Sequence, residues 1–109
     1  MEGRKGTVYV AGKINGNPDF RGDFARARDR LYRERWTHVI TPDVLSPLEL
    51  EYEQYMTICC AMIDASEAVY LLRNWKTSPG AIREKFYAMS RNKVILYEEA
   101  DDEEQPVRP

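Results

Sequence analysis

Short apolar segments alternate along the chain with segments whose apolar residues recur at helical spacing. The short segments are rich in β-branched and aromatic side chains, which predict four strands at residues 7–11, 37–40, 68–72 and 94–97. The periodic segments predict three helices at residues 20–35, 48–65 and 79–91. Alternation of strands and helices is typical of an α/β fold. We therefore expect three layers around a mostly parallel four-stranded sheet, flavodoxin-like or Rossmann-like.

Composition agrees with one ordinary globular domain. The chain has 109 residues, of which 43% are hydrophobic and 31% are charged. No apolar run approaches the roughly 20 residues that span a membrane. Residues 1–6 are polar and lack the apolar region of a signal peptide. We expect no membrane partner and a cytoplasmic protein.

Charge divides the chain into two parts. Residues 98–109 carry six acidic residues and one arginine, a net charge of −5, which leaves +3 for residues 1–97 because the whole chain is −2. The acidic segment lacks apolar periodicity, so we expect a domain at 1–97 and a disordered tail at 98–109. A mildly basic domain suits a small anionic ligand, whereas a nucleic-acid surface usually carries clustered basic residues.

The segment from 74 to 84 joins the third strand to the third helix. Ser78 is a favoured N-cap residue and Pro79 then falls at the first helical position. Free N–H groups and the helix dipole at such a start can bind an anion. Glu84 shares a helix face with the small residues Gly80 and Ala81, which is unusual for a solvated glutamate. The alternative is an ordinary surface carboxylate.

A glycine-punctuated loop follows the first strand. It contains Gly12, Lys13, Asn15 and Gly16, and it fits neither the GxGxxG pattern nor a P-loop. Glycine here predicts either close approach of a ligand or a turn with positive φ. Because parallel strands place their carboxyl ends together, we expect the ligand between this loop and residues 74–78.

The remaining reactive side chains favour structural roles. His38 is the only histidine and lies in a predicted strand, and Cys59 and Cys60 fall in the apolar stripe of the second helix. Asp64 is expected at the surface. No triad or metal-ligand spacing is present, so we expect neither a metal nor a cofactor.

Two motifs resemble the nucleoside 2-deoxyribosyltransferase superfamily. Residues 8–16, VYVAGKING, are similar to its opening strand and loop, and residues 75–84, with Trp75, Ser78, Gly80 and Glu84, are similar to its second signature. In particular the chain resembles a small branch of phage and bacterial proteins, the domain of unknown function numbered 4406. The resemblance covers about residues 8–97.

This resemblance implies a chemistry and a set of roles. Relatives cleave the N-glycosidic bond of deoxynucleosides or their 5′-monophosphates, with a glutamate at the position of Glu84 as nucleophile. It implies that Tyr9 contacts the carboxylate or sugar and that Ser78 holds the 5′-phosphate or 5′-hydroxyl. The remaining expected substrate-binding residues are Gly12, Lys13, Asn15, Gly16, Trp75 and Gly80. If the protein is phage-encoded, the host cytoplasm is its expected location.

The resemblance also implies a homodimer or a higher even assembly, because relatives complete their sites across an interface. The second helix offers Tyr52, Tyr55, Met56 and the two cysteines for such a contact.

One position departs from the pattern. Active relatives carry an aspartate on the second helix where Cys59 stands here. A thiol cannot replace a carboxylic acid as general acid at neutral pH without a shifted pKa. Three alternatives follow: weak catalysis, substitution by another acid, or a binding module for a nucleotide or an ADP-ribose-type ligand without turnover.

Overall fold

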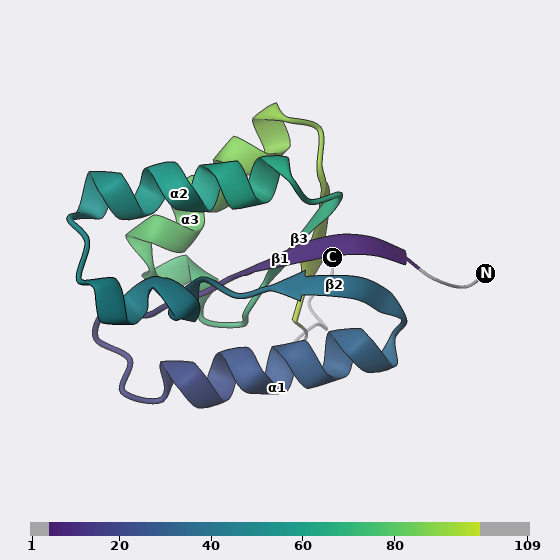
Figure 1. Ribbon diagram of the computed structural model, residues 1–109, viewed down its shortest axis with the longest axis horizontal. Coiled ribbons are helices and arrows are strands. Elements are labelled where there is room, and N and C mark those ends of the chain that lie inside the picture. Colours follow the sequence, from purple (N-terminus) through teal and green to yellow (C-terminus); the bar gives the residue numbers. More distant parts are fainter. Residues whose placement is uncertain (1–4, 99–109) are drawn as a thin grey trace, which may run out of the picture.

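A computed structural model describes residues 5–98 and confirms the expected α/β fold (Figure 1). Four strands form one parallel sheet in the order β2-β1-β3-β4. Their bounds are β1 Lys5–Ala11, β2 Trp36–Ile40, β3 Ala68–Leu71 and β4 Val94–Tyr97. This is a flavodoxin-type order, and all pairs are parallel where a mostly parallel sheet was expected.

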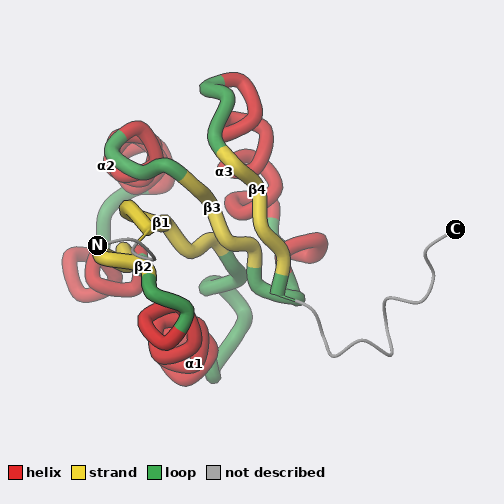
Figure 2. Tube along the Cα trace, turned by 90° about the vertical axis from the view of Figure 1, so that its right-hand side faces the viewer, coloured by secondary structure: helices red, strands yellow, loops and turns green. Residues whose placement is uncertain are grey.

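Helices cover both faces of the sheet. Their bounds are α1 Phe20–Arg33, α2 Tyr52–Asp64 and α3 Pro79–Ser90, with two short 3-10 helices, η1 Pro42–Leu48 and η2 Trp75–Thr77. The view along the sheet places α1 on one side of the strands and α2 and α3 on the other (Figure 2). The domain is therefore a three-layer structure.

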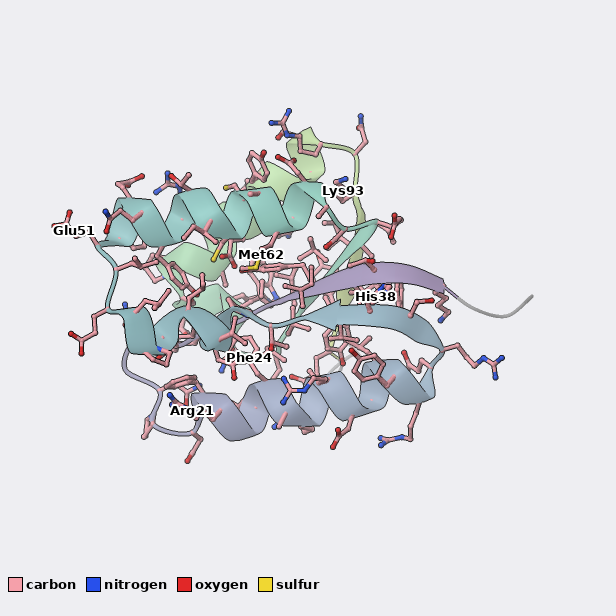
Figure 3. All side chains as sticks on the ribbon, in the orientation of Figure 1. Arg21, Phe24, His38, Glu51, Met62 and Lys93 are labelled. Atoms are coloured by element: carbon pink, nitrogen blue, oxygen red, sulfur yellow. The ribbon has the colours of Figure 1, made fainter. Side chains whose placement is uncertain are left out.

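Side-chain alternation along β1 builds two cores. Val8 and Val10 pack with Phe24 of α1, whereas Tyr9 and Ala11 face the opposite side and pack with residues of α2 and α3. Phe24 on α1 and Met62 on α2 accordingly point toward the sheet from opposite sides (Figure 3). This alternation aims Tyr9 at the layer that contains Glu84.

Two helix boundaries differ from the sequence prediction for the same backbone reason. The first helix ends at Arg33 rather than 35, because Arg35 has a left-handed φ of 79°. The second begins at Tyr52 rather than 48, because residues 42–48 form η1 and Glu49 then takes a left-handed φ of 52°. A left-handed residue interrupts the helical path.

The expected tail begins at a residue that belongs to the packed domain. Glu98 is 7% exposed, accepts the backbone N–H of Arg73 at 2.8 Å and pairs with Arg26 of α1 at 2.9 Å. The rest of the expected tail, residues 99–109, lies outside the described residues. Within residues 5–98, no helix combines the length and apolar character needed to cross a membrane.

Candidate functional site

A pocket of about 370 Å³ lies at the carboxyl edge of the sheet. From β1 the chain runs through α1 to β2 on one side, and from β3 it runs through α3 to β4 on the other. The loops after β1 and β3 therefore diverge at this point of the sheet, which is where open α/β sheets bind ligands. Gly12 and Asn15 from the first loop and Ser78 from the second line the pocket, as the sequence predicts.

Glu84 lines this pocket from the first turns of α3 and is 3% exposed. The Tyr9 hydroxyl donates a hydrogen bond to its Oε2 at 2.9 Å, across 75 positions of sequence. Tyr9 is fully buried and does not line the pocket. The structure thus brings together the two residues expected to do chemistry, with the carboxyl group at the cavity and the phenol behind it.

Burial sets the acidity of Glu84. Loss of water raises the pKa of the carboxyl group to about 7, although the Tyr9 hydroxyl and the Cys59 thiol beside it lower the pKa by favouring the charged form. Burial, followed by the charge of Glu84, raises the pKa of Tyr9 well above its ordinary value. Tyr9 is therefore a hydrogen-bond donor at neutral pH, and Glu84 changes charge near neutrality.

Cys59 occupies the space beside this pair. It is fully buried on α2, and burial followed by the nearby charge of Glu84 raises the pKa of its thiol to about 12. Burial, followed by the nearby charges of Cys59 and Glu84, raises the pKa of Tyr55, which lines the pocket. The thiol is protonated at neutral pH, so Cys59 presents a weak hydrogen-bond donor beside Glu84.

The start of α3 is capped as the sequence predicts. Ser78 Oγ accepts the backbone N–H of Ala81 at 3.1 Å, and Pro79 occupies the first helical position. Gly80 lines the pocket, and a Cβ there would lie 3.9 Å from the sulfur of Met56 and from the hydroxyl of Tyr52. Ser78 and Gly80 are therefore both in reach of a bound molecule.

The first loop contributes fewer side chains than expected. A Cβ at Gly12 would lie 2.3 Å from Cδ1 of Leu72, so glycine permits close passage of the chain. Gly16 has a left-handed φ of 77°, which glycine adopts without strain. Lys13 and Gly16 do not line the pocket. The Lys13 N–H instead donates to the Asn74 side chain at 3.1 Å, which ties the two loops together.

Trp75 also lies apart from the pocket. Its indole packs against the core between the sheet and α3, with its ring centroid 6.1 Å from that of Tyr97 and the Lys85 ammonium 4.4 Å above it. It belongs to η2, whose turn directs it toward β4. We expected Trp75 to contact the substrate, but it does not line the pocket.

His38 and Asp64 lie away from the pocket, as expected. His38 lies on β2 (Figure 3), is exposed, and is in register with Thr7 of β1. Asp64 is exposed at the end of α2 and accepts a hydrogen bond from Tyr87 at 2.7 Å. Among residues 5–98, no group of three His, Cys, Asp or Glu side chains has the arrangement of a metal site.

One wall of the pocket was missed by sequence reasoning. It is formed by η1, the following turn and the start of α2, through Leu45, Ser46, Glu49, Leu50 and Tyr52. The available signal was positional, because residues 41–51 leave the carboxyl end of β2 and so reach the same edge as the other two loops.

The protein belongs to the class of parallel α/β domains that have a pocket at the topological switch point of the sheet. The family model described as Domain of unknown function (DUF4406) matches residues 6–97, and the chain belongs to that family. The sequence resemblance to the DUF4406 family is thereby confirmed. A search of curated proteins found no match.

Proposed function

We propose that the protein cleaves the N-glycosidic bond of a (deoxy)nucleoside or its 5′-monophosphate, with Glu84 as nucleophile. The supporting observation is a nearly buried carboxyl group that lines the pocket and accepts a hydrogen bond from Tyr9. The link to the nucleoside 2-deoxyribosyltransferase superfamily is part of this proposal, because Tyr9, Ser78 and Glu84 stand at its motif positions.

The reaction would proceed in two displacements. A carboxylate oxygen of Glu84 attacks the anomeric carbon, the C1′–N bond breaks, and its electron pair leaves with the base, which takes a proton from water. Water, or a second base, then displaces the carboxylate and releases the sugar or a new nucleoside. Tyr9 orients the carboxyl group throughout and stabilises its charged form.

The test is release of free base. Purified protein is incubated with the four deoxynucleosides, the four ribonucleosides and their 5′-monophosphates, and free base is separated by chromatography. We expect release from at least one of them, and Glu84→Gln should lower the rate by at least about a thousandfold because it removes the nucleophile.

Asp29→Asn is the matched control, because Asp29 is exposed on α1, on the opposite side of the sheet. Its base release should equal that of the unaltered protein. Base release that survives Glu84→Gln would contradict the mechanism.

The second candidate is a binding module for a nucleotide or an ADP-ribose-type ligand. The observation that favours it is Cys59, a protonated thiol beside Glu84 with no acidity to offer a leaving base. Ligand binding without base release from any of these compounds would favour this candidate.

A further inference from the structure

The charged side chains of the pocket wall are all of one sign. Glu49 and Glu84 line it, and within the described part of the chain no lysine, arginine or histidine does. Two carboxyl groups in a partly enclosed pocket repel an anion more strongly than they would in open water. The described basic residues among those that give residues 1–97 their net charge of +3 therefore do not line the pocket.

The start of α3 has few donors left for an anion. Pro79 has no N–H, the N–H of Ala81 bonds the Ser78 hydroxyl at 3.1 Å, and the N–H of Ile82 bonds the Ser78 carbonyl at 3.0 Å. Across positions 79–82, only Gly80 has an N–H with no partner among residues 5–98. A phosphate offers three acceptor oxygens, whereas this end of α3 offers one free N–H and the hydroxyl hydrogen of Ser78, which suit a single hydroxyl group.

Glu49 is held at the pocket by an uncommon backbone. Its φ of 52° is left-handed, a conformation that a side chain with a Cβ adopts at a cost. Its N–H bonds the Ser46 carbonyl at 3.2 Å, which closes η1 and turns the chain toward α2. The turn places Glu49 at the pocket, where it is exposed to solvent.

We propose that the pocket selects an uncharged nucleoside over the matching 5′-monophosphate, and that Glu49 is a residue that enforces this choice. The selection rests on the proposed function for the class of ligand. The 5′-hydroxyl accepts the Gly80 N–H beside Ser78, and a 5′-phosphate in the same place meets two carboxyl groups without a compensating cation.

Equilibrium binding tests this without requiring turnover. Each deoxynucleoside and its 5′-monophosphate is titrated by calorimetry into the unaltered protein and into Glu84→Gln, at low salt and pH 8. We expect at least one base for which the unaltered protein binds the nucleoside about tenfold or more tighter than it binds the matching 5′-monophosphate. Glu49→Gln should narrow that ratio about three- to tenfold, mainly by strengthening monophosphate binding, because it removes one repelling charge.

Asp29→Asn makes the same charge change on the far layer and should leave the ratio unchanged. The effect of Glu49→Gln should shrink at 0.5 M salt. Equal or tighter binding of the monophosphates, an unchanged ratio in Glu49→Gln, or no binding of any nucleoside at millimolar concentration would overturn the selection. Tighter nucleoside binding without base release would support it while refuting only the proposed reaction.

Discussion

Glu84 couples the site to the stability of the protein. Burial raises the pKa of its carboxyl group from the ordinary 4.5 to about 7, so the folded chain holds a proton that the unfolded chain has already released between these two values. The stability contributed by the neutral form is complete below pH 4.5 and is lost as the pH rises through 7.

We expect Glu84→Gln to remove this pH dependence. The neutral amide cannot ionise, so above pH 7 the variant should exceed the unaltered protein in free energy of unfolding by on the order of 2–3 kcal/mol, and near pH 4.5 the difference should vanish. Urea unfolding from pH 4.5 to 8.5 measures both curves. Parallel curves would show that Glu84 does not titrate in this range.

Tyr9→Phe serves as the companion variant. It deletes the hydroxyl that favours the charged carboxylate, so the pKa of Glu84 rises further and the loss of stability extends above pH 7. If the pH range over which stability is lost moved to lower pH in Tyr9→Phe, the proposed role of the hydroxyl would be contradicted.

The two residues of this pair were predictable to different degrees. Glu84 could be singled out from its own helix, because its neighbours on that face are small. Tyr9 was expected at the carboxylate only through the family resemblance. Their 2.9 Å contact joins β1 to α3 across 75 positions, and no local pattern specifies such a distance. The position of Cys59 beside them is likewise a product of packing.

Helices and strands whose own residues carry a strong signal were predicted at the correct positions. The fourth strand and the start of α3 were predicted at their observed residues, because apolar runs and an N-cap followed by proline are local signals. The 3-10 helix η1 was missed, since it lacks the 3.6-residue period and contains Pro47. The pocket wall that η1 forms was missed with it.

The Ser78 cap provides a prediction for α3. Ser78→Ala removes the acceptor of the Ala81 N–H and should lower the free energy of unfolding by about 1 kcal/mol. Ser90→Ala is the control, because Ser90 is exposed at the other end of the same helix, where its hydroxyl bonds only the Tyr87 carbonyl. Urea unfolding should give a smaller loss for the control; equal losses would show that the cap stabilises α3 no more than the Ser90 hydroxyl does.

At the scale of the molecule, the sheet order could not be derived from the alternation of elements. Alternation predicts parallel strands, but the order β2-β1-β3-β4 depends on the side of the preceding strand on which each crossover places the next one. Glu98 illustrates a second limit, because its acidic neighbourhood suggested a tail while its carboxylate joins α1 to the loop after β3. Composition reports charge, whereas the pairing of that charge depends on the finished fold.

The surface around the pocket bears on assembly. Large apolar side chains remain exposed on η1 and α2, namely Val44, Leu48, Tyr52 and Ile58. Tyr52 also lines the pocket, so a surface that covers these residues would border the site. A second group, Phe86, Met89, Val94 and Tyr97, is exposed on α3 and the edge strand β4.

We expect a homodimer that uses the η1 and α2 surface. Association buries these apolar side chains, and a stable interface needs about 800 Å² from each partner. Light scattering at micromolar concentration should give twice the mass of the chain. Leu48→Glu should convert the dimer to a monomer, because it places a charge in an apolar contact, whereas Phe86→Glu on the second group should not. A monomeric unaltered protein would refute the dimer, and dissociation by Phe86→Glu alone would assign the interface to α3 and β4 instead.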